Sequence, residues 1–353
     1  MTYRKGNRRR AVLDSLAVGG QYRVRQAGER DTARRRNENK GRLAPMRTLT
    51  IKVFPGAMNI ALWAAADKGF LEKRGLAVDI RYTGGSVEQL TEFIAGEHDL
   101  LLTSIDNTIA YKEGQGEVPV SGGDTDLVAF MGCDDAYLRF VVQADIKSFA
   151  DLRGKVLTVD AMTTGFAFVL RRMLAANGIG EDEVTWTTAG GVMQRWQALM
   201  EGKHTGTLLV TPFEFMGEAK GLHVLSKTAD VLDHYQGIVG AARRGWAEAN
   251  GDDLTNFIAG YIEAVNWLYE PANRSAAADI LQAHLPQMPR AVAERSAAAY
   301  LADKGGIVRD GGFDMKGIEA ILELRAEYGP APADLHGGDT YIDTRWLERA
   351  RRG

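Results

Sequence analysis

The stretch DLRGKVLTVDAMTTGFAFVLRRMLAANGI, residues 151–179, decides the fold class. Its segment KVLTVD is apolar and β-branched, which predicts a buried strand, and GFAFVLRRMLAANG has the apolar spacing of a helix that ends at a glycine. Between them lies a polar loop, 160–165, which carries hydroxyls and a glycine but no nucleophile and no lysine. A strand that leads through a short loop into a helix is the unit of parallel α/β proteins. We therefore expect an α/β fold in which this loop holds a ligand.

The same alternation of strands and helices occurs twice along the chain. The first run has expected strands at residues 47–54, 77–83 and 99–105 and helices at 58–75 and 86–97. Ser86 followed by Gln89 predicts a capping box at the second of these helices. The second run has the expected strands KVLTVD, VTWTTA and TGTLLVTP and the helices GFAFVLRRMLAANG and GVMQRWQALMEG. Two such runs predict two lobes that face each other across a cleft.

Strands near 126–144 and 230–243 are expected to cross between the lobes and to act as hinges. After residue 243 the pattern is almost wholly helical. The expected organisation is lobe 1 at 46–137, completed by 236–353, lobe 2 at 138–235, and a helical part at 244–353 that packs mainly on lobe 1.

The composition of the chain of 353 residues is that of a globular protein, because 45% of the residues are apolar and 25% are charged. No apolar run approaches the roughly 20 residues that span a bilayer. The single cysteine, Cys133, excludes an internal disulfide. The six histidines are scattered without metal-ligand spacing, and phosphate-loop and dinucleotide patterns are missing, so no cofactor is expected.

Residues 1–45 carry 11 arginines and 2 lysines against 4 acidic residues, although the whole chain has a net charge of −3. Three interpretations stay open: a non-native extension before Met46, an unusual export signal, or a basic arm for phosphate groups. All three predict a disordered basic extension.

Four segments resemble a known family, the type II solute-binding proteins of ABC importers, in particular the nitrate, sulfonate, taurine and thiamine-precursor group. They are AADKGFLEKRGLAVDIRYTGGSVEQLTEFIAGEHDLLLTSID, IKSFADLRGKVLTV, GGVMQRWQALMEGKHTGTLL and TYIDTRWLERA, and the resemblance extends over 46–353. One departure is EGKHTGTLL, where the family usually has an acidic residue and this chain has His204 and Thr205. A second departure is the absence of a clear signal peptide.

The resemblance implies a two-lobed type II periplasmic-binding-protein fold, in which each lobe is a mixed, mostly parallel sheet with flanking helices and the ligand binds between the lobes. It also implies a periplasmic monomer that captures a small organic anion (a sulfonate, a carboxylate or an aromatic acid), docks on an ABC permease in the membrane and binds no nucleic acid. The alternative is a cytoplasmic enzyme on the same fold, a decarboxylase or desulfinase of an aromatic acid. The iron-dependent members of this fold family need a cysteine-rich motif, which a chain with one cysteine cannot supply.

Candidate ligand-binding residues lie in the loops that follow the strands, where helix N-termini favour an anion. Thr164 is expected to cap the helix at 165, Asp106 to be a cap or the partner of an amine, and Arg195 either to pair with a ligand acid or to lie on a solvated face. Cys133 is either a nucleophile near the cleft or a structural residue. The resemblance implies that Met58 and Asn59 contact the ligand. The other expected site residues are Gly85, Ser104, Asp106, Cys133, Thr163, Thr164, Gly165, Gly191, Arg195, Thr211 and Phe213. Most of the aromatic residues near these loops are expected in the core, and one or two of them are expected to form an apolar wall of the cleft. They are Phe54, Trp63, Phe166, Phe213, Phe215 and Tyr235.

Overall fold

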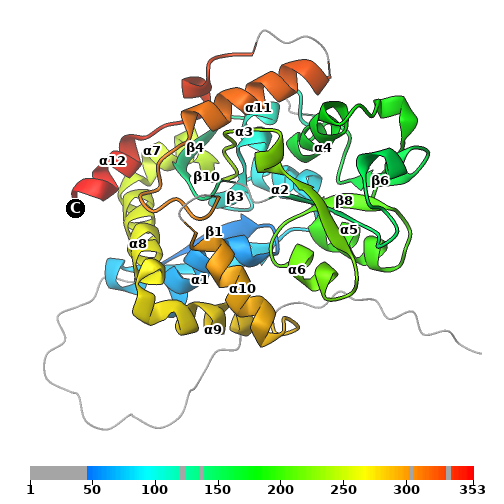
Figure 1. Cartoon of the computed structure of the whole chain (residues 1–353). Helices are drawn as coiled ribbons and strands as arrows, with labels where there is room; N and C mark the ends of the chain where they lie inside the picture. Colours follow the sequence, from blue (N-terminus) through cyan, green and yellow to red (C-terminus); the bar gives the residue numbers. More distant parts are fainter. Residues whose placement is uncertain (1–45, 120–124, 136–137, 303–304, 331–334) are drawn as a thin grey trace, which may run out of the picture. The chain divides into compact units, whose positions relative to one another are not determined.

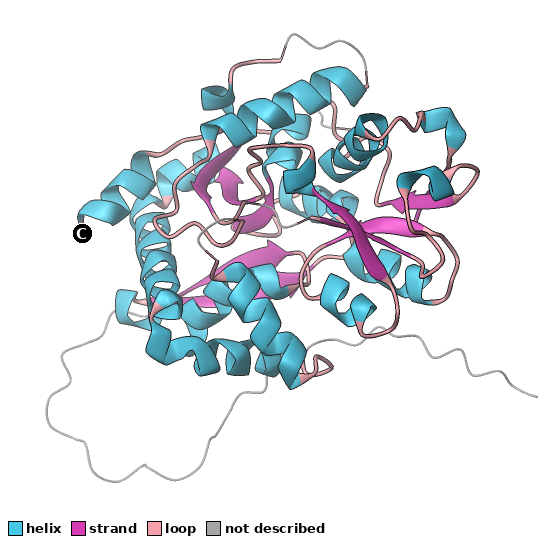
Figure 2. Cartoon of the chain, viewed as in Figure 1, coloured by secondary structure: helices cyan, strands magenta, loops and turns pink. Residues whose placement is uncertain are grey.

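The computed structural model describes residues 46–119, 125–135, 138–302, 305–330 and 335–353. The basic extension at 1–45, predicted to be disordered, lies outside the described residues. The described strands form two five-stranded mixed sheets that are flanked by helices (Figure 1). Figure 2 shows the two groups of strands with helices around each of them. The predicted α/β fold class is confirmed.

The first sheet has the strand order β2-β1-β3-β10-β4. Its strands are β1 (Arg47–Val53), β2 (Leu76–Tyr82), β3 (Leu100–Ser104), β4 (Leu127–Gly132) and β10 (Ile238–Arg243). β1 runs parallel to β2 and β3, whereas β10 runs antiparallel to β3 and β4. The two central strands β1 and β3 therefore end at the same edge, where their following loops can face a common ligand.

The second sheet has the order β7-β6-β8-β5-β9 and repeats this plan. Its strands are β5 (Arg139–Val142), β6 (Val156–Val159), β7 (Thr185–Thr188), β8 (Gly206–Leu209) and β9 (His223–Lys227). β6 is parallel to β7 and β8, and β5 is antiparallel to β8 and β9. The chain thus leaves the first sheet after β4, completes the second sheet, and returns in β10.

Twelve α-helices are assigned in the described residues. They are α1 (Ile60–Asp67), α2 (Ser86–Ile94), α3 (Ile105–Lys112), α4 (Gly165–Ala176), α5 (Val192–Met200), α6 (Phe213–Glu218), α7 (Arg244–Ala249), α8 (Gly251–Tyr269), α9 (Arg274–His284), α10 (Arg290–Tyr300), α11 (Met315–Tyr328) and α12 (Arg345–Arg352). None of them combines the length and the apolar character that crossing a membrane requires.

The helix α1 forms the centre of the first lobe's core. Its sequence IALWAAAD is apolar on every side, and the residues from Ile60 to Ala65 are all buried. A helix of this kind is stable only when other elements surround it, and α8 and α9 pack against it. Trp63 is completely buried there and stacks on the ring of His284 from α9.

The helices after residue 244 contact both lobes. α8 and α9 pack against α1, and α12 packs against β4, and both α1 and β4 belong to the first lobe. In contrast, α11 packs against α4 and α10 contacts α6, which both belong to the second lobe. Figure 1 shows α11 lying beside both α3 and α4. The C-terminal part of the chain therefore connects the two lobes as well as completing the first one.

Helix caps follow the sequence-based expectation at α4 but not at α2. The hydroxyl of Thr164 accepts from the backbone N–H of Ala167 at 3.4 Å, as predicted for an N-cap. The predicted capping box at α2 is wrong, since Gly85 is the N-cap and Ser86 is already helical. Gln89 is instead fully buried, and its amide donates to the carbonyls of Lys52 and Leu102. These two hydrogen bonds connect α2 to both β1 and β3, and this tertiary contact takes the place of a local capping box.

A test of the packing of the first lobe is the substitution Gly132→Ala at the end of β4. A Cβ atom there would lie 2.1 Å from the carbonyl oxygen of Gly312, so the backbone of one segment must move. We expect the free energy of unfolding to fall by about 2 kcal/mol, the usual cost of overpacking a core. Urea denaturation measures this difference.

The matched control is Gly245→Ala in α7, where the nearest atom to the new Cβ is Asp126 Oδ2 at 3.4 Å. Alanine is the better helix former, so this variant should be as stable as the wild type or more stable by about 0.5 kcal/mol. Equal denaturation midpoints for Gly132→Ala and the wild type would contradict the described packing.

Candidate functional site

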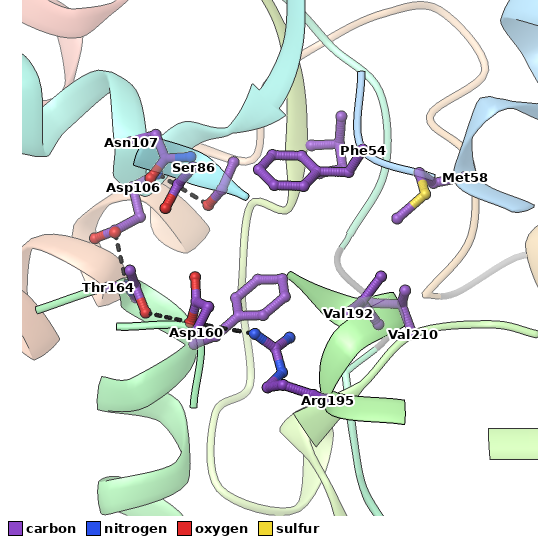
Figure 3. A pocket seen from close by; sticks show the side chains of 14 residues that line it. Phe54, Met58, Ser86, Asp106, Asn107, Asp160, Thr164, Val192, Arg195 and Val210 are labelled. Carbon is purple, nitrogen blue, oxygen red and sulfur yellow. Dashed lines mark hydrogen bonds and ion pairs between the residues drawn. The ribbon is translucent and has the colours of Figure 1, made fainter. Parts of the chain in front are cut away.

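A cavity of about 50 Å³ lies between the loops of the two lobes (Figure 3). The first lobe supplies residues from the ends of β1 and β3 and from the starts of β10, α2 and α3. The second lobe supplies residues from α4, from α5 and from the end of β8. The lining residues are Phe54, Met58, Ser86, Ser104, Asp106, Asn107, Asp160, Thr164, Gly165, Phe166, Val192, Arg195, Val210 and Ile238.

Six of the thirteen residues expected from the sequence line this cavity: Met58, Ser104, Asp106, Thr164, Gly165 and Arg195. Thr163 lies beside it, in a smaller cavity that shares Ser86, Asp106, Asn107 and Thr164 with the first. The remaining six do not line the cavity: Asn59, Gly85, Cys133, Gly191, Thr211 and Phe213. The expected aromatic wall is formed by Phe54 and Phe166.

Arg195 is the cationic group of the cavity lining. Its side chain is buried, with 2% of its surface exposed, so the solvated position considered from the sequence is excluded. Nη1 donates to the carbonyl of Gly190 at 3.0 Å and lies 3.4 Å from Asp160 Oδ1, while Nε has no hydrogen-bond partner. Burial lowers the pKa of the guanidinium, and the Asp160 carboxylate opposes this shift. A buried cation with an unused donor is suited to pairing with an acid group.

Asp106 has a partner that the sequence did not predict. Its Oδ1 accepts from Nε of Arg325 at 2.9 Å, and both of its oxygens lie 2.7 Å from Nη2 of the same arginine. Its Oδ2 also accepts from the backbone N–H of Gly165 at 2.7 Å. The expected role of Asp106 as a helix cap is wrong, because Ser104 caps α3 by accepting from the N–H of Asp106. The cation that Asp106 meets is a guanidinium of the protein itself.

Two further backbone hydrogen bonds join the lobes at the rim of the cavity. The N–H of Gly191 donates to the carbonyl of Gly84 at 3.0 Å, and the N–H of Ala57 donates to the carbonyl of Thr211 at 3.2 Å. A Cβ atom on Gly191 would lie 2.5 Å from the Gly84 oxygen, so glycine is required for this approach. In this arrangement the amide of Gly191, expected from the sequence to face a ligand, binds the opposite lobe.

The other residues outside the cavity have structural partners. The amide of Asn59 donates to the carbonyls of Phe54 and Gly56 and so shapes the turn after β1. Phe213 packs against Trp196, with ring centroids 5.9 Å apart. The hydroxyl of Thr211 donates to Oε1 of Glu214, a carboxyl group with no exposed surface. Burial raises the pKa of Glu214 to about 7, and the hydrogen bond from Thr211 acts in the opposite direction.

Cys133 is buried beside Tyr261, with 2% of its surface exposed, and does not line the cavity. Burial raises the pKa of its thiol far above the usual range, and Asp134 adds to this effect. A reactive cysteine needs the opposite shift. Its position therefore supports the structural interpretation.

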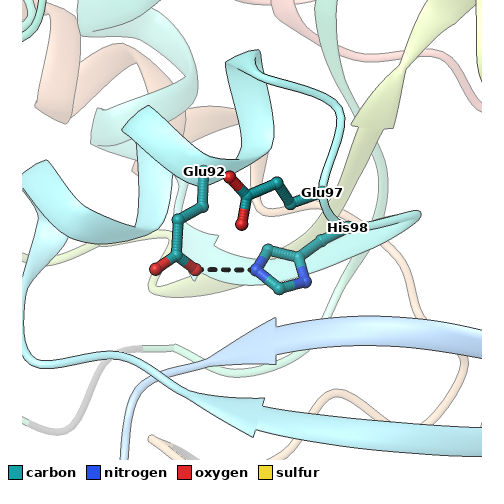
Figure 4. Close-up of side chains that lie close together, drawn as sticks. All are labelled: Glu92, Glu97 and His98. Atoms are coloured by element: carbon teal, nitrogen blue, oxygen red, sulfur yellow. Dashed lines mark hydrogen bonds and ion pairs between the residues drawn. The ribbon is translucent and has the colours of Figure 1, made fainter.

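One group of potential metal ligands, Glu92, Glu97 and His98, occurs in the described residues (Figure 4). Nε2 of His98 lies 2.8 Å from Glu92 Oε2, and the ammonium of Lys52 lies 2.6 Å from the same oxygen. The lysine already places a cation beside this carboxylate, so the group is explained as an ion-pair network between α2, the loop that follows it and β1.

Comparison with known families gives one match of broad coverage. Residues 58–274, more than half of the chain, match the family model described as NMT1/THI5 like. A comparison with curated proteins gives no match.

Solved structures share the fold at low sequence identity. The alkanesulfonate-binding protein SsuA from Xanthomonas axonopodis pv. citri, bound to MOPS, has a TM-score of 0.68 at 17% identity over 85% of this chain and 99% of that one. The periplasmic nitrate-binding protein NrtA from Synechocystis PCC 6803 has a TM-score of 0.71 at 13% identity, over 87% of this chain and 89% of that one. A DszB mutant in complex with biphenyl-2-sulfinic acid has a TM-score of 0.59 at 13% identity, over 87% of this chain and 99% of that one. These similarities confirm the type II periplasmic-binding-protein fold, which carries binding proteins and an enzyme alike.

The buried carboxyl of Glu214 predicts a pH dependence of stability. Its pKa is about 7 in the folded protein and about 4.3 in an unfolded chain, so the folded state binds the proton more tightly. The stability that this proton binding adds to the folded state is fully present at acidic pH and is lost as the pH rises through 7. The loss in the free energy of unfolding is on the order of 3 kcal/mol. The variant Glu214→Gln should lack this loss and should exceed the wild type in stability at pH 8.

Denaturation midpoints between pH 5 and 8 measure this effect, with Glu248→Gln, an exposed glutamate on α7, as the control. The control should keep the slope of the wild type. An unchanged slope in Glu214→Gln would show that Glu214 is not the group responsible.

The burial of Cys133 predicts that its thiol is inert in the native protein. A bulky thiol reagent should label less than one tenth of the native protein in the time that labels the urea-unfolded chain completely, because only the exposed thiolate reacts. Rapid labelling of the native protein, counted by mass spectrometry, would contradict the described position of Cys133.

Proposed function

The chain belongs to the NMT1/THI5-like family, and from this premise we propose that it is the solute-binding component of an ABC importer. It captures a small organic anion, such as a sulfonate, a carboxylate or an aromatic acid, between its lobes. It works in the periplasm as a monomer, and its partner is the permease of the importer in the membrane. The similarity in fold to alkanesulfonate-binding and nitrate-binding proteins supports this proposal.

The observation that carries the proposal is the buried guanidinium of Arg195 in a cavity formed by both lobes. The hydroxyls of Ser86 and Ser104 line the same cavity and can donate to an acid group. Phe54 and Phe166 provide apolar surface for the rest of a solute. Such a set of groups recognises an acid attached to a small apolar or aromatic body.

The contacts across the cleft imply that binding involves a movement of the lobes. The N–H groups of Ala57, Gly165 and Gly191 each donate to an acceptor on the opposite lobe, so both lobes enclose the cavity in this arrangement. Entry of a solute therefore involves a separation of the lobes, and the segment between β9 and β10 is a position where the chain can bend.

The alternative, a cytoplasmic decarboxylase or desulfinase, draws on the fold that the chain shares with DszB. The described residues that line the cavity include no cysteine, histidine or lysine, and Cys133 is buried outside it. These features favour binding over chemistry that depends on a cysteine, histidine or lysine at the substrate.

The proposal predicts a rise in melting temperature with small organic acids and no formation of product. A ligand that binds only the folded state at 100 times its Kd adds about 2.7 kcal/mol of stability. A thermal-shift screen followed by calorimetry identifies the acid, and mass spectrometry shows whether it is recovered unchanged. Conversion of the acid would establish the enzyme alternative instead.

The role of Arg195 is tested with Arg195→Gln against Arg81→Gln, an exposed arginine on β2. Loss of a charged hydrogen bond of about 1.5–3 kcal/mol should weaken the affinity by roughly 10-fold to 100-fold in the first variant only. Equal affinities of both variants and the wild type would remove Arg195 from the site.

A further inference from the structure

We propose that Asp106, held in place by Arg325, determines the charge selectivity of the cavity: it admits an organic acid with one anionic group and rejects a solute with a second one. This inference rests on the proposed function and specifies the substrate class of that site. It follows from the position of the Asp106 carboxylate on the N-terminus of α4.

The carboxylate of Asp106 occupies the place where an anion would bind α4. Its Oδ2 accepts from the N–H of Gly165 at 2.7 Å, and Gly165 is the first residue of the helix. Free N–H groups and the helix dipole attract a negative charge at this point. Because the protein supplies that charge itself, a ligand anion at this end would lose the helix donor and would meet a carboxylate.

Gly165 is required for this contact. A Cβ atom at this position would lie 2.7 Å from Cγ of Asp106, so any larger residue would push the carboxylate away from the helix. The sequence thus provides both the acid on α3 and the space for it on α4. The two features come from different lobes, and together they form one polar contact across the cleft.

Arg325 prevents Asp106 from turning aside. The arginine is completely buried and binds both carboxylate oxygens. Its Nη1 donates to Gln115 Oε1 at 2.9 Å, its Nη2 lies 3.3 Å from the carbonyl of Thr163, and its guanidinium lies 5.1 Å from the ring centroid of Phe168. These contacts fix the guanidinium from both lobes, so the carboxylate is held over α4.

A second acid, Asp160, lies beside Arg195 and limits the positive charge at that end of the cavity. It lines the cavity, its Oδ1 accepts from the hydroxyl of Thr164 at 2.8 Å, and the same oxygen lies 3.4 Å from Nη1 of Arg195. The lining contains two carboxylates and one guanidinium, that of Arg195. A ligand anion therefore binds at Nε of Arg195, which has no partner in the protein, and a dianion would place its other charge near Asp106. Close like charges in a site that excludes water are strongly unfavourable.

The experiment measures the affinity of the full chain for matched pairs of acids by calorimetry at pH 8 and constant ionic strength. The pairs are butanoate with butanedioate and benzoate with benzene-1,4-dicarboxylate, and the acid found by the screen is paired with its own dicarboxylate analogue. We expect the monoacid of a pair to bind at least about 10-fold more tightly than the diacid. Equal or tighter binding of the diacids would overturn the inference while leaving the proposed function intact.

The variant Asp106→Ser removes the carboxylate and leaves the N–H of Gly165 and the guanidinium of Arg325 for a ligand. This variant should reduce the difference in affinity between the monoacid and the diacid to less than about 3-fold, mainly because the diacid binds more tightly. Where removal of this buried charge prevents folding, Asp106→Asn keeps the size of the side chain and should narrow the difference in the same direction. Unchanged discrimination in a folded Asp106 variant would overturn the inference. If no acid of any kind binds the wild type, the proposed function fails and the inference fails with it.

Discussion

A buried ion pair between Asp106 and Arg325 holds the two lobes in their described arrangement. The aspartate comes from the first lobe, the arginine comes from α11, and the N–H that completes the set comes from α4 of the second lobe. Both side chains are almost fully removed from water, with 2% and 0% of their surfaces exposed. A buried pair is tolerated when every lone pair and proton has a partner, and loss of one member leaves a charge that costs about 3–5 kcal/mol. Both carboxylate oxygens accept from the guanidinium of Arg325, and Oδ2 also accepts from the N–H of Gly165, so that condition is met.

The same interaction changes how the cavity is understood. A helix N-terminus at the edge of a parallel sheet is a general anion site. For this reason the sequence predicts that Gly165 and Gly191 face a ligand anion. In the structure both N–H groups are used between the lobes, by a carboxylate and by a carbonyl. The cavity is lined instead by side chains: the guanidinium of Arg195, a few hydroxyls and two phenyl rings. Under the proposed function the backbone amides serve closure, and these side chains serve recognition of the solute.

The fold and part of the site could be predicted from the sequence because both depend on local patterns. Strand–loop–helix units, such as the one around Thr164, identify the edge of the sheet where a ligand binds, and Ser104 and Arg195 follow from that rule, whereas Met58 follows from the family resemblance. Arg325 could not be found in this way. It is 219 positions from Asp106 and lies in a helix whose pattern is that of ordinary packing. Nothing local shows that α11 reaches across to α4.

Burial also separates residues that look alike in the sequence. Cys133 and Asp106 both follow buried strands of the first sheet, but one is enclosed in the core and the other reaches the cleft. Gln89 has the spacing of a capping residue and instead ties two strands together. In each case the tertiary contact outweighs the local preference, which is a property of the folded chain and not of a window of residues.

Native-state hydrogen exchange at the amides of Ala57, Gly165 and Gly191 tests the central claim most directly. These three N–H groups donate across the cleft, so opening of the lobes should expose them together. They should exchange with a common opening free energy, and a bound solute should slow all three by the same factor. Three unrelated exchange rates, or protection that does not change when the solute is bound, would contradict it.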